Sequence, residues 1–283
     1  MFHDVTDHPA PFSLECGLTV GVDRFRRQAE FLAETFRIMS ADELLAGQVP
    51  PRAALLTFDD GFAGVFRLAL PILRALGIPS TVFLNMATVS GEPCWGARVV
   101  YLCRHVDGFR EFLVERCGDS ARIDPHMVCS PSLLRAWEAR EGLASREMLR
   151  AYAGSFATRD DLEAVRGDPL VTFGSHSFHH YSFRALSEEE ADADIRANAD
   201  ALAAYPNSRP MFAFPFGVPG RSFSARHVER VLGHGYRRLF TVVSRVNDQP
   251  FTSVLHRIAL TDWHDRRSRL WYQVARAALE GRP

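Results

Sequence analysis

Two adjacent carboxylates end an apolar run, a position that favours acid–base or metal chemistry. The run Ala-Ala-Leu-Leu-Thr-Phe occupies residues 53–58 and is followed directly by Asp59, Asp60 and Gly61. Such a run, bounded by turn residues, is typical of a buried strand. Charges there are costly to desolvate and neighbouring carboxylates repel, so a positive group should lie beside them. An isolated Asp-Asp-Gly would more often be a solvated turn, so the interpretation depends on two later stretches.

Three histidines follow another predicted strand and could bind a metal. His176, His179 and His180 come just after the apolar residues 170–174. One helical turn would place His176 and His180 on the same side, with His179 pointing elsewhere, toward substrate or the surroundings of the metal. Neutral imidazoles at this spacing are good ligands for zinc and related metals. A single histidine would more often be structural, but three in five positions favour a metal site.

A third stretch, residues 212–217 with the sequence Phe-Ala-Phe-Pro-Phe-Gly, also ends a predicted strand. Its aromatic residues, Pro215 and Gly217 predict a rigid apolar loop with an accessible backbone N–H at Phe216. A core strand followed by a turn would give the same pattern. In a barrel of parallel strands, however, the carboxyl ends share one face, where active sites are built. The three stretches would then meet there.

The elements around these stretches alternate between strand and helix, which indicates a parallel sheet. A weak first strand over residues 2–5 carries His3 and Asp4. The apolar patterns predict further strands at residues 53–59, 80–84, 170–174, 211–214, 236–243 and 254–260. They predict helices at residues 22–35, 40–45, 65–76, 187–204, 224–232 and 267–279.

Residues 97–167 interrupt the alternation. Their pattern is helical throughout, which predicts a helical insertion or lid. The side chains expected to be buried in it are Trp137, Leu143, Met148, Leu149 and Phe156.

Composition excludes several classes of protein. The 283 residues are 47% hydrophobic and 24% charged, with a net charge of −1, which argues against a general nucleic-acid or membrane-surface binder. Five cysteines without a Cys-x-x-Cys pair do not suggest a disulfide framework. The sequence offers neither a signal peptide at its start nor an apolar run of the roughly 20 residues that span a bilayer. We therefore expect a cytoplasmic protein.

Taken together, the three stretches resemble the polysaccharide deacetylase family, also called the NodB-homology family or carbohydrate esterase family 4. Residues 57–61 resemble its first motif, His176-Ser177-x-x-His180 its second, and residues 212–217 a version of its third. The resemblance covers roughly residues 1–262, and the joint pattern is far more specific than any single motif. It implies a distorted (β/α)7 barrel, formed by a single domain over residues 1–283, with the insertion at about 97–167.

The resemblance also implies roles for individual residues. Asp60, His176 and His180 would hold one divalent metal, with zinc the first expectation and cobalt, nickel or manganese as alternatives. Asp59 would be the general base that takes a proton from the attacking water. The oxyanion would form between the metal and the N–H of Phe216, in the loop that contains Pro215.

Two departures from the family pattern concern Asp59 and the general acid. The common third motif carries an arginine where this chain has Ala213, and Arg257 could supply that charge. The late Leu-x-His motif of the family, which supplies the acid, is approached only by Leu255-His256. Neighbours in a strand point to opposite faces, so His256 and Arg257 cannot both enter the barrel unless the strand ends or bulges. We favour the orientation in which the Arg257 side chain points into the barrel, because Asp59 beside Asp60 needs a positive partner. Weaker candidates for the acid are His179, His234 and His264.

The expected reaction is hydrolytic removal of an N-acetyl group from an amino sugar or a sugar-containing intermediate. Given the expected location, a nucleotide-, lipid- or small-molecule-linked sugar fits better than cell-wall glycan. An alternative is hydrolysis of another C–N bond, in a cyclic amide or ureide, on the same scaffold. A different class, an inactive sugar-binding protein, is disfavoured because a binding module does not need a base beside a metal.

Overall fold

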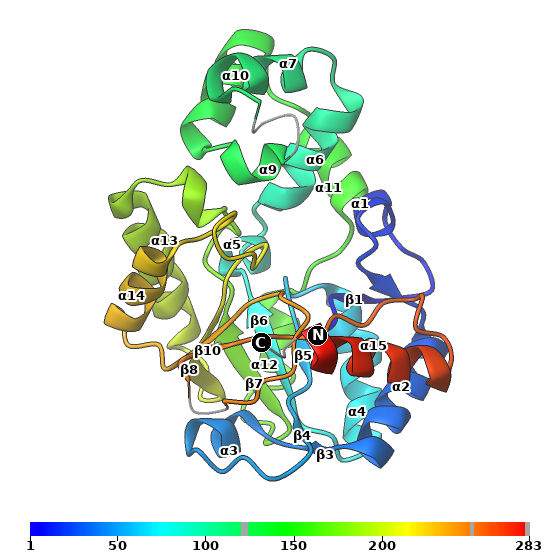
Figure 1. The fold of residues 1–283 in the computed structure, drawn as a ribbon. Coiled ribbons are helices and arrows are strands. Elements are labelled where there is room, and N and C mark those ends of the chain that lie inside the picture. Colours follow the sequence, from blue (N-terminus) through cyan, green and yellow to red (C-terminus); the bar gives the residue numbers. More distant parts are fainter. Residues whose placement is uncertain (120–123, 250–251, 281–283) are drawn as a thin grey trace.

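The centre of the molecule is a curled sheet of six parallel strands (Figure 1). The computed structural model describes residues 1–119, 124–249 and 252–280. The strand order is β10-β9-β8-β7-β6-β5, and every pair is parallel. The strands are β5 (Thr57–Phe58), β6 (Ser80–Leu84), β7 (Val171–Ser175), β8 (Ser208–Ala213), β9 (Arg238–Phe240) and β10 (Val254–Leu255). All carboxyl ends therefore lie on one face, as the alternating sequence pattern predicts.

The N-terminal segment closes the gap between the two edges of this sheet. Phe2 pairs in parallel with Phe58 of β5, and its N–H donates to the Thr57 carbonyl at 2.9 Å. On the other side, the Leu260 N–H donates to the Met1 carbonyl at 3.0 Å. The N-terminal segment thus occupies a seventh position, and the distorted barrel expected from the sequence is confirmed.

Two small parallel pairs flank the barrel. They are β1 (Asp4–Val5) with β2 (Thr19–Val20), and β3 (Arg37–Ile38) with β4 (Ala53–Ala54). The run over residues 53–59 was expected to be one strand, and this is wrong in detail. Its first residues pair with β3 and its last with β6, so the run is divided between two sheets.

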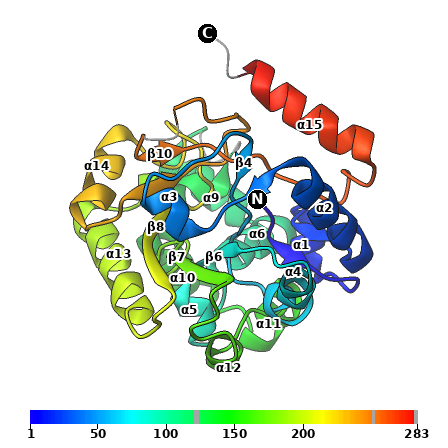
Figure 2. The ribbon, with the colours of Figure 1, turned by 90° about the horizontal axis from the view of Figure 1, so that it is seen from below.

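Helices surround the strands, as the view from below shows (Figure 2). The amphipathic patterns predicted the longer ones to within a few residues, although residues 65–76 begin as a π-helix, η1 (Val65–Ala69). Outside the insertion the helices are α1 (Pro11–Glu15), α2 (Val22–Thr35), α3 (Ala41–Leu45), α4 (Leu70–Ala75), α5 (Met86–Val89), α12 (Arg159–Glu163), 3-10 helix η2 (Phe183–Ala185), α13 (Glu188–Leu202), α14 (Ala225–Gly233) and α15 (Arg267–Glu280). The short helices α1, α5 and η2 were not predicted. None of the helices in the described ranges is long and apolar enough to cross a membrane.

The helical insertion stands over the carboxyl ends of the strands (Figure 1). It contains α6 (Trp95–His105), α7 (Phe109–Cys117), α9 (Pro125–Val128), α10 (Pro131–Glu141) and α11 (Arg146–Ala153). Helix α12 also falls in the range of about 97–167 predicted for the insertion, but it pairs with η1 of the barrel through Asp161 and Arg67. Trp137 and Leu149 are buried as expected, but Leu143 and Met148 are 76% and 49% exposed, which corrects the prediction. The insertion is too small to bury every apolar side chain: its own core gathers around Trp95, Phe109 and Trp137.

The chain leaves the insertion beside the paired aspartates. The Ala63 N–H donates to the Ser155 carbonyl at 2.9 Å, and the Ala157 N–H to the Gly61 carbonyl at 2.8 Å. The rings of Phe62 and Phe156 stack with centroids 4.7 Å apart. The insertion is therefore fixed directly to the loop that carries Asp60.

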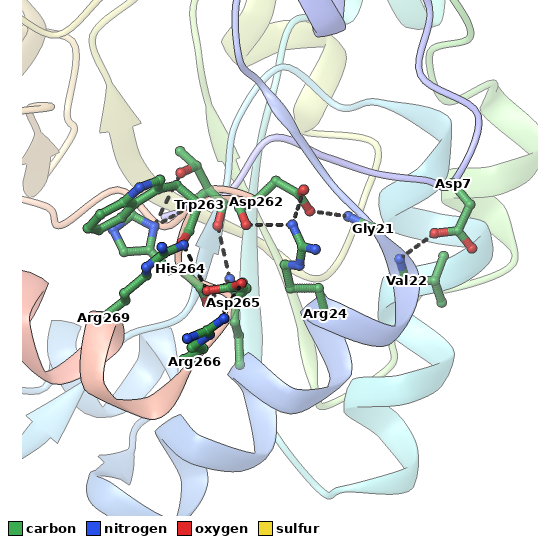
Figure 3. A network of polar contacts seen from close by, with 12 residues as sticks. Asp7, Gly21, Val22, Arg24, Asp262, Trp263, His264, Asp265, Arg266 and Arg269 are labelled. Carbon is green, nitrogen blue, oxygen red and sulfur yellow. Dashed lines mark hydrogen bonds and ion pairs between the residues drawn. The ribbon is translucent and has the colours of Figure 1, made fainter.

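The segment after β10 is fixed to the N-terminal half by a polar network (Figure 3). The Asp262 side chain accepts from the Gly21 N–H at 3.1 Å and pairs with Arg24 of α2. Gln28 donates to the carbonyls of Thr261 and His264, both at 3.0 Å. This network fixes residues 261–264 beside the beginning of α2.

Candidate active site

Asp60, His176 and His180 meet at the carboxyl ends of β5 and β7. The Asp60 Oδ1 atom lies 3.3 Å from His176 Nε2 and 3.2 Å from His180 Nε2. All three possible ligand atoms lie within 4.8 Å of one another. Asp60 Oδ1 is buried and makes no hydrogen bond within the described part of the chain. A buried orphaned carboxylate oxygen facing two imidazole nitrogens fits a divalent metal such as zinc.

The second nitrogen of His176 fixes its tautomer. His176 Nδ1 lies 2.7 Å from the Ala213 carbonyl, which can only accept, so this nitrogen carries the proton. Nε2 is then left with a lone pair directed at Asp60. This is the arrangement in which proteins present histidine to a metal.

The two imidazoles do not come together through a helical turn, so that part of the prediction is wrong. Residues 176–182 form a loop, in which Ser177 and His180 both have φ of 63°. The chain bends at residues 178 and 179, and the His180 N–H donates to Ser177 Oγ at 3.1 Å. Asp60, with φ of 68°, has the same left-handed conformation. Such strained residues persist where the surrounding structure holds them, commonly at functional sites.

A buried aspartate on α13 holds this loop. Asp194 accepts from the backbone N–H of Phe178 at 2.9 Å and of His179 at 3.2 Å. His179 also turns its ring toward Asp194, with Nδ1 2.6 Å from Oδ1. His179 therefore supports the loop and does not join the cluster of Asp60, His176 and His180.

Asp59 is buried and forms a two-pronged ion pair with Arg257. The two carboxylate oxygens lie 2.6 and 2.7 Å from Nη1 and Nη2 of the guanidinium. Burial by itself would raise the pKa of Asp59, but the charge and hydrogen bonds of Arg257 are the leading opposing effect, and the pKa lies below its usual value. Asp59 is thus kept ionised, 3.9 Å from His176 Nε2.

The side chain of Arg257 points into the barrel. This is the orientation that the sequence analysis favoured over an inward-pointing His256. Arg257 Nε donates to the Thr241 carbonyl at 3.1 Å, and the guanidinium lies over the rings of Phe83 and Phe240. His256 instead places Nδ1 2.9 Å from Thr241 Oγ1. His256 does not reach the cluster of Asp60, His176 and His180, because neighbours in an extended chain face opposite ways.

His3 is a residue of the site that the sequence did not single out. Phe2 lies against β5, since the Asp59 N–H donates to the Phe2 carbonyl at 3.0 Å, and this places His3 beside the paired aspartates. Burial lowers the pKa of His3, and the charges of Asp60 and Asp59 offset only part of this effect, so the pKa lies below its usual value. The only signal in the sequence was a histidine in the weak first strand, and nothing local predicted that this strand would lie beside β5.

The loop after β8 forms another wall of the site. Phe216 has φ of 57°, and its ring centroid lies 4.8 Å from that of His180. Gly217 follows with φ of 54°, and a Cβ there would lie 2.7 Å from the Val242 backbone nitrogen, so glycine is required. From the insertion, His126 stacks on Phe216 with centroids 5.5 Å apart. Pro215 and Phe216 are therefore part of the wall, and α9 covers it.

A family profile with the description "Polysaccharide deacetylase" matches residues 46–239, which is more than half of the chain. The chain belongs to the polysaccharide deacetylase family. The match contains all three stretches around Asp60, His176 and Phe216. This deacetylase removes N-acetyl groups from carbohydrate by hydrolysis.

Solved structures of deacetylases share the fold. IcaB from Ammonifex degensii is 19% identical, with a TM-score of 0.61 over 96% of this chain and 94% of that one. Streptococcus pyogenes PplD, solved in complex with acetate, is 14% identical, with a TM-score of 0.63 over 97% and 96%. A de-N-acetylase from Aggregatibacter actinomycetemcomitans is also 14% identical, with a TM-score of 0.60 over 96% and 97%. No curated protein sequence matches this deacetylase.

Proposed function

We propose that this deacetylase hydrolyses the acetamide of an N-acetylated amino sugar with one divalent metal, most simply zinc, held by Asp60, His176 and His180. The convergence of their three ligand atoms beside the ionised Asp59 carries this proposal. One carboxylate and two neutral imidazoles leave open coordination positions, which is typical of catalytic sites. When bound there, the metal would polarise the acetamide carbonyl and lower the pKa of a water molecule.

Asp59 is proposed as the general base. It accepts a proton as water attacks the acetamide carbonyl carbon, and Arg257 keeps it ionised for this step. Arg257 thereby supplies the charge that the common family motif places at the position of Ala213. The N–H of Phe216 donates to the oxygen on which negative charge develops.

The leaving amine needs a proton, and His3 is proposed to supply it. Phe2 pairs with Phe58 of β5 and accepts from the Asp59 N–H, so His3 follows directly beside the paired aspartates, whereas His256 bonds to Thr241. Donation by His3 completes the cleavage of the C–N bond, giving acetate and the free amine.

Acetate release from a panel of N-acetylated sugars tests the proposed function. We expect turnover with the metal-loaded protein, loss of turnover after chelation, and recovery when zinc is added back. Cobalt, nickel and manganese should be added in parallel to identify the preferred ion. Failure of every sugar in the panel to yield acetate with any of the four ions would refute the proposal.

A paired substitution tests the proton donor. His3→Gln should lower turnover by roughly 10²–10⁴-fold and remove the alkaline limb of the pH–rate profile, because the general acid is lost. His256→Gln should leave both unchanged. Bound metal and melting temperature should be measured for each variant, to separate loss of the acid from loss of the fold. The opposite pattern, with His256→Gln inactive and His3→Gln active, would assign the proton donor to His256.

A further inference from the structure

A groove of about 720 Å³ lies apart from the aspartate–histidine cluster. Its walls come from opposite ends of the sequence, the loop after β1 with the beginning of α2, and the segment after β10 (Figure 3). Side chains that line it include Thr6, Asp7, Leu14, Arg24, Asp262 and Trp263. The volume lies in the range of small-ligand sites in proteins, which are roughly 300–1,000 Å³.

The groove lies at the same end of the barrel as the active site. Residues 1–3 run parallel to β5, so Thr6 and Asp7 follow at the end where Asp59 and Asp60 lie. Residues 258–260 run alongside Met1, which brings Thr261 to Trp263 to that end as well. Three residues of extended chain separate His3 from Thr6, which is about 10 Å. One extended ligand could therefore reach both places.

Trp263 is a rigid aromatic surface in the wall of this groove. Its side chain is 53% exposed, although a large indole is usually mostly buried. Arg269 lies 4.7 Å from the ring centroid and donates to the Trp263 carbonyl and to Asp265, each at 3.0 Å. The His264 ring meets the indole edge-on at 5.2 Å. An ordered, exposed indole can stack on the C–H face of a pyranose ring without first losing conformational freedom.

The charged side chains of the groove, Asp7, Asp23 and Asp262 with Arg24 and Arg27, largely offset one another, which favours a neutral ligand. The first N–H groups of α2 are already bonded to carboxylates, Gly21 to Asp262 and Val22 to Asp7, so the helix end does not attract an anion. Arg24 is paired with Asp262 as well. Each carboxylate has about four acceptor positions, which leaves some for hydroxyl groups of a ligand.

We propose that this groove binds a second part of the substrate, a neutral sugar unit that stacks on Trp263 while the acetamide of another unit lies at Asp59. The inference rests on the proposed function for the reacting unit, and its new element is a second sugar-binding position in this groove. The acceptor groups of Asp7 and Asp262 bind the hydroxyls of the stacked sugar.

Trp263→Ala tests the groove, with Trp271→Ala as a matched control. Trp271 is also exposed, at 47%, but it lies on α15 against Phe31 and does not line the groove. KM and kcat should be measured with N-acetylglucosamine and its β-linked oligomers of two to five units. We expect Trp263→Ala to raise KM for the longer oligomers by roughly tenfold, with kcat and the monosaccharide unchanged. Trp263→Phe should be intermediate, because it keeps a smaller ring.

The same oligomers should be titrated calorimetrically into metal-loaded protein carrying Asp59→Asn, with and without Trp263→Ala. Weaker binding of long oligomers on loss of Trp263 supports the groove even if no sugar yields acetate, which separates this inference from the proposed function. Equal effects of Trp263→Ala and Trp271→Ala, equal effects on the monosaccharide and the oligomers, or no effect at all would overturn it. Melting temperatures of both variants should match the parent protein.

Discussion

Replacing both His176 and His180 with alanine should abolish metal binding and deacetylation together. Asp60 would be the only remaining ligand of the proposed site, and a single carboxylate cannot complete a zinc coordination shell. The backbone of the loop should persist, because Asp194 and Ser177 hold it through main-chain N–H groups. The expected result is a folded protein without metal and without turnover.

Metal content of the purified variant, measured by elemental analysis, checks this expectation. His179→Ala is the matched control, since His179 lies in the same loop but turns toward Asp194. The control should retain one metal per chain. Stoichiometric metal in the double variant would show that the ion binds elsewhere, and the assignment of Asp60, His176 and His180 would be wrong.

Asp59→Asn and Asp60→Asn should have different consequences, although the residues are neighbours. Asparagine at position 59 keeps the shape but cannot accept the proton, so turnover should fall by roughly 10²–10⁴-fold while the metal stays bound. Asparagine at position 60 removes the charged ligand, so metal affinity should fall together with turnover.

Titration with zinc and the turnover of each variant at saturating zinc distinguish the two roles. Asp60→Asn should recover part of its activity at high zinc, and Asp59→Asn should not. Asp59→Asn also leaves the buried Arg257 without its partner, so the melting temperature of this variant should fall. Its turnover and zinc binding should therefore be measured below that temperature. If Asp59→Asn lost the metal and Asp60→Asn kept it, the roles would be interchanged.

The chemistry of the proposed site could be predicted from local sequence because its residues follow apolar strands directly. Asp60, His176 and Phe216 each come just after such a strand, and parallel strands bring these ends to one face. The amphipathic helices could be predicted in the same way, and α2 begins and ends at the predicted residues, Val22 and Thr35. Local periodicity determines these features, since each depends on residues only a few positions apart.

Contacts between distant parts of the chain could not be predicted in this way. The His176–His180 loop depends on left-handed residues and on Asp194, which lies 14 positions beyond His180. Leu143 and Met148 fit a helical pattern, yet they are exposed because the insertion has little core to bury them in.

The sequence by itself determined the parallel strands, the paired aspartates and the histidine pair, because these follow from strand ends and residue types, and the family resemblance added the barrel. Only the tertiary structure decided that Arg257, and not His256, faces Asp59, and that His3 belongs to the site. Both depend on how the first and last segments close the barrel, with Met1 between residues 258–260 and β5. Closure of the barrel depends on contacts between residues more than 250 positions apart in the sequence. Local sequence patterns carry no information about such contacts.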